Sequence, residues 1–238
     1  MVCLELTLST LSENLALDEA LLLQAESEQG HETLRFWEWT SLAVVLGAGC
    51  RLADDVDEAA CKADRVLILR RSSGGGTVLL GRGCLLFSLI LGYERSPFLR
   101  EIRPSYCYIL GLIRDALADL LPGVACAGTS DLAADGLKFS GNSQQRKRHH
   151  LLHHGTLLYD FDIQSIGRYL RLPSRQPAYR AGREHAAFVR NLPCDAAELR
   201  KRMCAAWDAK EPITDWPSDT VDRLVAQKYG RTEWHQRR

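Results

Sequence analysis

The sequence has no surplus of charge of either sign, since 30 lysines and arginines balance 30 aspartates and glutamates among its 238 residues. A chain without net charge has no surface-wide field that would draw it to nucleic acid or to an anionic membrane. We therefore expect neither as a partner. Charged residues make up 25% of the chain and hydrophobic residues 46%, a composition typical of a globular protein with a substantial core.

Long apolar segments are also missing. The longest apolar run, residues 84–91, is far too short to cross a bilayer. The first ten residues have neither the basic start nor the apolar block of a secretory signal peptide. The eight cysteines include no C-x-x-C pair, and several lie within apolar runs. We expect reduced thiols in a cytoplasmic protein that has no membrane partner.

Two common phosphate-binding signatures and a metal signature are absent. No G-K-[ST] sequence occurs, and Gly47-Ala48-Gly49 lacks the third glycine and the following helix of a dinucleotide fingerprint. The four histidines between positions 149 and 154 have no cysteine or acidic partner at ligand spacing, so we expect no zinc site there. The basic run 146–150 is short and has no interleaved aromatics, which favours an exposed loop.

The most informative segment that is present is Arg70-Arg71-Ser72-Ser73-Gly74-Gly75-Gly76-Thr77-Val78. The residues before it, 66–69, and those after it, 77–80, have the composition of strands, which predicts a glycine-rich hairpin. Consecutive glycines expose backbone N–H groups and let a ligand approach the chain closely. Because two arginines stand beside them, the segment predicts an anion site next to an apolar wall. A flexible turn with solvated arginines would have the same local pattern.

Patterning elsewhere predicts an α+β fold in which helices pack on a sheet made of hairpins. Expected helices cover residues 12–29, with Gly30 as stop signal, and 54–63, 102–121, 196–207 and 220–229. Expected strands cover residues 34–39, 42–46, 84–91, 131–134, 137–141 and 151–159. Asp135-Gly136 predicts a type I′ turn, and Asp195 with Glu198 predicts a capping box. We expect one domain, residues 1–238, with a helical tail from about residue 195.

Lys138 and Cys126 are the candidate catalytic side chains. Alternation along a strand favours a lysine that faces solvent between inward neighbours. However, the small residues Ser140-Gly141-Asn142-Ser143 follow Lys138 at once, which indicates a close approach to a ligand. Cys126 is a candidate acyl-accepting nucleophile, but its apolar neighbours favour an inert, small hydrophobic side chain.

Together these segments resemble the lipoate–protein ligase family, within the wider group of biotin and lipoate ligases and octanoyltransferases. The resemblance is carried, in the family's order, by residues 14–19, 70–78, 130–132, 138–143 and 154–158, with Lys228-Tyr229 and Trp234 near the end. It implies a biotin/lipoate ligase-like catalytic domain: a mixed, largely antiparallel sheet flanked by helices. It also implies that the small C-terminal accessory domain of single-chain ligases is absent, so that a separate accessory protein is a candidate partner.

The resemblance implies an enzyme that joins lipoate to AMP, using ATP and magnesium, and then passes the lipoyl group to a lysine of a lipoyl carrier domain. Lys138 corresponds to the family's catalytic lysine, a fixed cation at the point where a carboxylate attacks a phosphate. Asp131 is a candidate to hold Lys138 or magnesium. The implied lipoate- and ATP-binding residues are Arg70, Arg71, Ser73, Gly74, Gly75, Gly76, Thr77, Val78, Asp131, Ser140, Gly141, His154, Gly155 and Thr156.

Two alternative functions stay open. One is an octanoyltransferase that carries its acyl group as a thioester on Cys126, and the other is a non-catalytic paralogue that binds lipoyl domains. Leu137 replaces a basic residue that often precedes the family's lysine, and residues 177–192 match the family weakly. The choice between lipoate and octanoate is therefore open as well.

Overall fold

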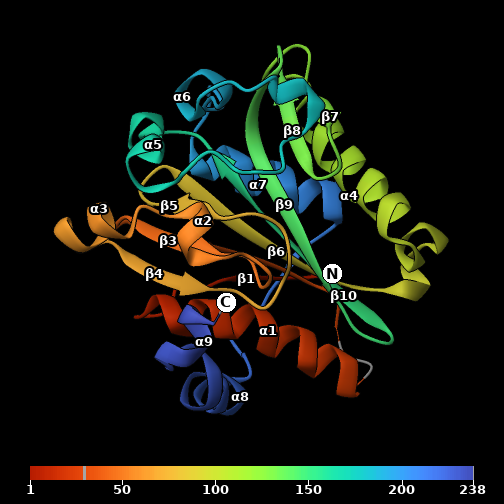
Figure 1. Cartoon of the computed structure of the whole chain (residues 1–238). Coiled ribbons are helices and arrows are strands. Elements are labelled where there is room, and N and C mark those ends of the chain that lie inside the picture. Colours follow the sequence, from red (N-terminus) through yellow and green to blue (C-terminus); the bar gives the residue numbers. More distant parts are fainter. Residues whose placement is uncertain (29–30, 238) are drawn as a thin grey trace.

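The structure is a computed structural model that describes residues 1–28 and 31–237 (Figure 1). Its centre, within these residues, is a sheet of eight strands. Edge to edge they are Glu211–Pro212 (β11), Val2–Glu5 (β1), Thr33–Glu38 (β2), Cys84–Gly92 (β6), His150–Leu158 (β10), Leu137–Arg146 (β9), Asp131–Ala134 (β8) and Ala125–Ala127 (β7). Neighbours from β2 to β7 run antiparallel, whereas β1 is parallel to β2 and β11. The predicted mixed, largely antiparallel sheet is confirmed.

A smaller sheet in the described part of the chain has the strand order Leu67–Arg70 (β4), Ala43–Leu46 (β3) and Val78–Leu80 (β5). Because β3 lies between β4 and β5, these two strands do not pair with each other. The predicted glycine-rich hairpin is therefore wrong. The Arg71 N–H still bonds the Leu46 carbonyl of β3, and residues 72–77 then cross over β3 to reach β5.

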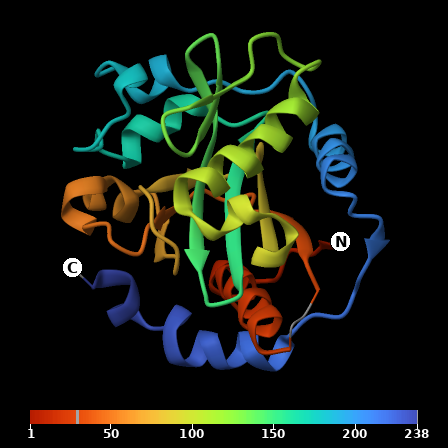
Figure 2. The same cartoon turned by 90° about the vertical axis from the view of Figure 1, so that its right-hand side faces the viewer.

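Two hydrophobic cores lie on opposite faces of the large sheet (Figures 1 and 2). Alternate residues of β6 separate them, since Leu86 and Ile90 enter the first core while Leu85 and Phe87 enter the second. The first core contains helix Leu11–Glu28 (α1) and the small sheet. The second contains helices Ile102–Leu117 (α4) and Ala196–Trp207 (α7).

Shorter helical segments connect these layers. They are Leu52–Asp55 (α2), Glu58–Ala63 (α3), Ile166–Tyr169 (α5) and His185–Phe188 (α6), with 3₁₀ turns at Tyr93–Arg95, Pro97–Arg100, Ile163–Ser165 and Ala178–Arg180. The predicted continuous helix 54–63 is wrong. Val56 is extended and bridges Leu170, and Asp57 restarts the chain as the N-cap of α3 by accepting a 2.9 Å hydrogen bond from the Ala60 N–H.

The predicted turn, helix starts and helix stop agree with the structure in part. Asp135 and Gly136 both have positive φ, 51° and 71°, between β8 and β9, so the predicted turn is confirmed. The predicted capping box is correct in one half: the Asp195 side chain caps α7 at 2.8 Å from the Glu198 N–H, whereas the Glu198 carboxylate accepts from Arg202. Helix α1 begins one residue earlier than predicted. Its capping box is Thr10 with Glu13, because the Glu13 carboxylate accepts from the Thr10 N–H at 2.7 Å. The predicted stop, Gly30, lies outside the described residues.

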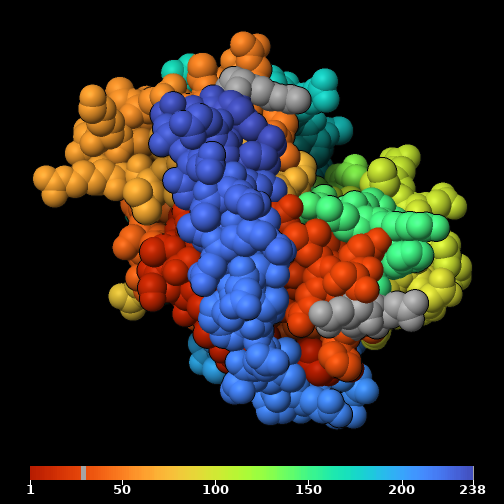
Figure 3. Space-filling view, turned by 90° about the horizontal axis from the view of Figure 1, so that it is seen from below, coloured from red at the N-terminus to blue at the C-terminus, as the bar shows by residue number. Residues whose placement is uncertain are grey.

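The C-terminal segment lies across the outer side of α1. It consists of Ser218–Leu224 (α8), a π-helical turn at Val225–Tyr229 and Thr232–Gln236 (α9), so the predicted helix 220–229 is correct only in part. Figure 3 shows this segment as a blue band against the red N-terminal part of the chain. Among the described residues, no helix combines the length and the apolar character needed to cross a membrane.

Candidate functional site

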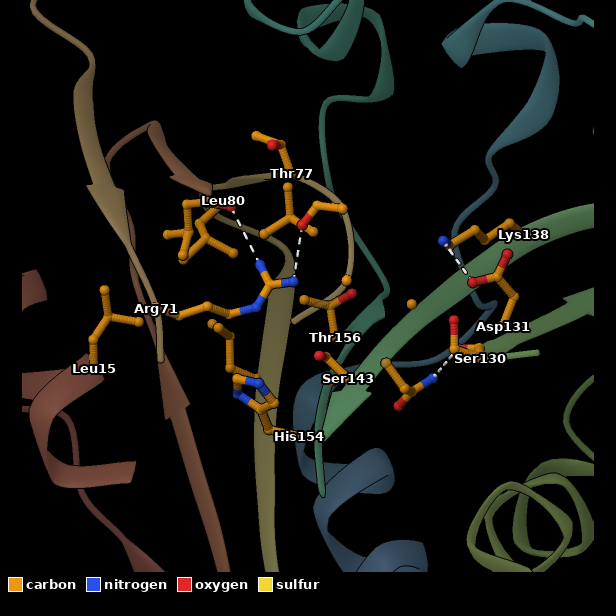
Figure 4. A pocket seen from close by; sticks show the side chains of 18 of the residues that line it. Leu15, Arg71, Thr77, Leu80, Ser130, Asp131, Lys138, Ser143, His154 and Thr156 are labelled. Atoms are coloured by element: carbon orange, nitrogen blue, oxygen red, sulfur yellow. Dashed lines mark hydrogen bonds and ion pairs between the residues drawn. The ribbon is translucent and has the colours of Figure 1, made fainter. Parts of the chain in front are cut away.

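A cavity of about 140 Å³ opens between the small sheet and strands β9 and β10 (Figure 4). One part of its lining is apolar and is formed by Leu15, Trp37, Val45, Val78, Leu80 and Leu86. The polar lining includes Arg71, Asp131, Lys138, Asn142, Ser143 and His154, together with the backbone of several glycines. Figure 4 shows Leu15 and Leu80 at one side of the pocket and the Lys138–Asp131 pair at the other. The cavity thus offers an apolar end and a charged end.

Lys138 is held at the charged end by a carboxylate. Its Nζ lies 2.7 Å from Oδ1 of Asp131, and its side chain remains 30% exposed while that of Asp131 is 9% exposed. Gly141 makes room for it, because a Cβ at that position would lie 2.8 Å from the lysine Nζ. The backbone of Lys138 is fixed as well, since its carbonyl accepts a 2.9 Å hydrogen bond from the Arg190 N–H. Lys138 is therefore an oriented cation that an incoming anion can reach.

Tyr179 completes this pair and was missed by sequence reasoning. Its hydroxyl donates to Oδ2 of Asp131 at 2.7 Å, so both carboxylate oxygens are engaged. Burial, followed by the neighbouring Asp131 charge, raises the pKa of Tyr179, which keeps the phenol protonated as a donor. Tyr179 belongs to the weakly matching segment 177–192, and no local pattern marks it.

Magnesium has no built site of its own among the described residues. No group of three or more histidine, cysteine, aspartate or glutamate residues is placed to hold a metal ion there. Each carboxylate oxygen of Asp131 already has one partner, Lys138 or Tyr179, so the geometry fits Asp131 to the role of holding Lys138.

Arg71 shapes the glycine segment from inside. Its guanidinium donates to the Gly74 and Gly76 carbonyls at 2.6 and 2.8 Å, to the Val45 carbonyl at 3.3 Å and to the Ser73 hydroxyl at 2.9 Å. Within the described residues no carboxylate pairs with it, and burial lowers its pKa to about 10. Gly75 needs its φ of +78°, and a Cβ there would lie 3.0 Å from the arginine Nη2. Arg71 thus fixes the backbone of the glycine segment around its guanidinium group.

His154 links the glycine segment to helix α1. Its Nε2 lies 2.5 Å from the Ser73 Oγ, and its Nδ1 faces Asp18 at 3.6 Å. Burial lowers the pKa of His154, so the ring is neutral near pH 7, and its partners assign the proton to Nδ1. Burial alone would raise the pKa of Asp18, but Arg35 at 2.6 Å lowers it and keeps the carboxylate charged.

Several predicted site residues do not line the cavity. Arg70 is fully buried and turns away, donating to the Gly47 and Cys50 carbonyls at 2.9 and 2.7 Å, so its predicted place beside the anion is wrong. The Ser73 hydroxyl and the Gly74 carbonyl instead accept hydrogen bonds from Arg71, and the Ser140 hydroxyl accepts one from the Asn142 amide. The other predicted residues, Arg71, Gly75, Gly76, Thr77, Val78, Asp131, Lys138, Gly141, His154, Gly155 and Thr156, all line it.

Cys126 does not line the cavity either. It lies on the edge strand β7 and is exposed, so the predicted apolar burial of this side chain is wrong. Partial desolvation still raises its pKa, which disfavours the nucleophilic thiolate. None of the described residues that form the cavity wall is a cysteine. All eight cysteines are unbridged, as expected for reduced thiols.

Comparison with known proteins finds octanoyltransferases and lipoate ligases that are similar to this chain in sequence. An octanoyltransferase LipM from Symbiobacterium thermophilum is 28% identical, with 95% of this chain and 94% of that protein aligned. A probable lipoate-protein ligase A from Mycoplasma pneumoniae is 29% identical over 67% of this chain and 45% of its own length.

Solved structures show the same fold. A bipartite lipoate protein ligase from Thermoplasma acidophilum, studied with its E2 lipoyl domain, superposes with a TM-score of 0.84 at 20% identity, covering 99% of this chain and 95% of that one. A lipoate-protein ligase A bound with ATP gives 0.81 at 21% identity, covering 99% of both chains. The lipoyl protein ligase A/B catalytic domain family matches residues 10–203, and the chain belongs to this family of lipoate ligases and octanoyltransferases.

Proposed function

We propose that this protein is a lipoate–protein ligase, which activates lipoate with ATP and transfers the lipoyl group to a lysine of a lipoyl carrier domain. The observation that carries the proposal is the Lys138 ammonium, held by Asp131 at the charged end of a cavity whose other end is apolar. An apolar end suits the acyl chain, and a fixed cation suits the junction of carboxylate and phosphate. Residues 1–238 act here as one catalytic domain.

The proposed chemistry has two steps. A lipoate carboxylate oxygen attacks the α-phosphorus of ATP, the acyl-AMP mixed anhydride forms and pyrophosphate leaves. An acceptor lysine amine then attacks the acyl carbon, and AMP leaves as the amide forms. Negative charge builds up at the junction in the first step, where an oriented ammonium stabilises it. Magnesium enters as part of the MgATP substrate, which agrees with the absence of a built metal site among the described residues.

The ATP-bound structural relative supports ATP as substrate, and the Thermoplasma relative supports a lipoyl domain as acceptor. Because that relative is bipartite, the proposal also includes a separate accessory protein. This protein would supply any step that the chain does not perform alone. The unbridged cysteines support the expected cytoplasmic location.

The second candidate is an octanoyltransferase, which the full-length similarity to octanoyltransferase LipM favours. A thioester mechanism requires a thiol at the acyl site. Cys126 lies outside the cavity wall and has a raised pKa, which argues against it. A purely binding paralogue would need neither Lys138 nor the cavity.

The experiment compares acyl donors on one apo-lipoyl domain, with acylation read by mass spectrometry. The donors are lipoate with MgATP, octanoate with MgATP, and octanoyl carrier protein without ATP. We expect acylation to require ATP and Cys126→Ser to keep most of the parent rate. If acyl transfer from octanoyl carrier protein occurs without ATP and is lost in Cys126→Ser, the ligase proposal is wrong and the octanoyltransferase takes its place. Exposed Cys107→Ser is the matched control.

A further inference from the structure

Residues 218–237, here called the C-terminal clamp, comprise α8, the π-helical turn and α9. The clamp packs on α1, and its last helix reaches β4 (Figures 1 and 3). None of its described residues lines the cavity, and the proposed chemistry uses none of them. We propose that the clamp positions the glycine segment 71–77 for acyl-substrate binding, with Trp234 and His235 as positioning residues; the substrate part of this inference rests on the proposed function.

The first line of contact is the outer edge of β4. Since β4 is an edge strand that pairs only with β3 within the described residues, the outward backbone groups of Arg70 need partners from elsewhere. The clamp supplies both. The Arg70 N–H donates to Nδ1 of His235 at 3.0 Å, and the Arg70 carbonyl accepts from Nε1 of Trp234 at 2.8 Å. These two bonds fix the backbone of the residue that directly precedes Arg71.

The Arg70 side chain extends the connection beneath the glycine segment. On one side it donates to the His235 carbonyl at 3.1 Å, and on the other to the Gly47 and Cys50 carbonyls. The turn at 47–50 in turn touches the glycine segment, because the Ala48 N–H donates to the Ser73 carbonyl at 2.8 Å. A Cβ on Gly47 would lie 2.1 Å from the Gly75 carbonyl oxygen, so the two backbones are in direct contact. A shift of the clamp would therefore move both sides of the segment.

A second, independent connection runs through helix α1. Oε2 of Glu19 accepts from Nζ of Lys228 and from the Tyr229 hydroxyl, both at 2.6 Å. Oε1 of the same carboxylate accepts from the Gln145 amide at 3.4 Å, and the Gln145 carbonyl oxygen accepts from the Ser72 hydroxyl. The clamp thus reaches the glycine segment from Arg70 and from Ser72.

The clamp residues are themselves held in place. Two cations lie over the Trp234 ring, with Lys228 Nζ at 4.2 Å and the Arg237 guanidinium at 3.5 Å from its centre. Nε2 of His235 lies 2.8 Å from the Tyr229 carbonyl. Because Nδ1 accepts from Arg70, the proton of the neutral ring is assigned to Nε2 as donor. The ring therefore joins the π-helical turn to β4.

The test uses the full-length protein with Trp234→Phe, which keeps the ring but loses the Nε1 donor, and with Tyr229→Phe, which loses one bond to Glu19. Arg231→Ala is the matched control, because this exposed residue of the same clamp bonds only within the clamp through its side chain. Backbone hydrogen–deuterium exchange of residues 70–78 is read without any ligand, followed by KM and kcat for lipoate.

For Trp234→Phe we expect about fivefold faster exchange at 70–78, the equilibrium factor for one lost hydrogen bond, and unchanged exchange in β6 and β10. KM for lipoate should rise by a similar factor while kcat stays within twofold. Parental exchange at 70–78 in both variants, or equally faster exchange throughout the chain, would overturn the proposal. The exchange readout stands even when the parent proves not to be a ligase, so the two failures are distinguishable.

Discussion

Arg71 and Lys138 are two cations on opposite walls of one cavity, and the structure uses them differently. Arg71, on the small-sheet side, is only 7% exposed and is surrounded by backbone carbonyls and the Ser73 hydroxyl. Lys138, on the large-sheet side, is 30% exposed and has one carboxylate partner that holds it. The donors of Arg71 are engaged in shaping the chain, whereas the ammonium of Lys138 is open to a substrate. We therefore assign the proposed chemistry to the Lys138 wall and the shaping of the site to the Arg71 wall.

The largest expected effect comes from removing the reachable cation. Lys138→Met should lower kcat/KM for lipoylation by a factor of about 10² to 10³, since one pre-organised electrostatic contact is worth about 3–4 kcal/mol in a transition state. The free energy of unfolding should fall by only about 1 kcal/mol, because Lys138 is partly solvated and the nearly buried Asp131 keeps Tyr179 as a donor. Steady-state kinetics and urea unfolding check both parts. Activity within threefold of the parent would remove Lys138 from the mechanism.

Arg71→Met should show the opposite profile. The carbonyls of Gly74 and Gly76 lose their donor in a buried place, which should lower the free energy of unfolding by about 2–3 kcal/mol. Urea unfolding at pH 7 measures this, with Lys138→Met as the matched control. Unchanged stability combined with lost lipoate binding would show that Arg71 acts on the substrate directly and would erase the difference between the two walls.

Strand β10 of the large sheet also carries a buried histidine, His153, on the face away from the cavity. His153 is fully buried between Gln144 and Asn142, at 3.2 and 3.3 Å, and burial lowers its pKa to about 3. As pH falls below 6.5 the unfolded chain takes up a proton at this residue while the folded chain does not, so stability is lost. At pH 5 this costs about 2 kcal/mol. Urea unfolding at pH 7 and pH 5 should show a smaller acid loss for His153→Gln than for the parent.

Exposed His31→Gln is the control for that comparison and should lose as much stability as the parent on acidification. Other buried histidines, among them His154 and His185, add to the parental loss, so the difference between parent and variant isolates His153. An identical pH dependence in His153→Gln and the parent would show that this ring is protonated in the folded protein.

Tyr179→Phe should have the smallest effect. It leaves Asp131 with Lys138 alone, so the carboxylate is held less firmly, and the loss of one hydrogen bond predicts about fivefold lower kcat. Initial rates with saturating lipoate and ATP measure it. Arg175→Ala, an exposed change in the same region, is the control. A rate equal to that of the parent would mean that Asp131 alone orients Lys138.

Signals that act over a few residues were readable in the sequence. The Asp135-Gly136 turn needs two positive φ angles, and the Asp195 cap bonds the N–H three residues on, so both could be predicted locally. The placement of β3 between β4 and β5 could not, because strand order depends on contacts between distant segments. For the same reason Tyr179, which meets Asp131 across 48 positions, left no signal.

Arg70 and Arg71 show most clearly what could not be predicted from the sequence. They are adjacent and chemically identical, and the sequence gives no ground for choosing between them. Successive side chains at a strand end point to opposite sides, so Arg70 turns toward the C-terminal clamp and Arg71 toward the cavity. Only the identity of the strand's neighbours on each side decides which arginine lines the cavity.

The central claim is that the reachable cation Lys138 serves the activation of a carboxylate by ATP. Exchange of labelled pyrophosphate into ATP, run with lipoate and magnesium but without any acceptor domain, isolates that step. We expect lipoate-dependent exchange in the parent and in Cys126→Ser, and an exchange rate lower by a factor of about 10² or more in Lys138→Met. No exchange in the parent, beside acyl transfer from octanoyl carrier protein, would contradict it.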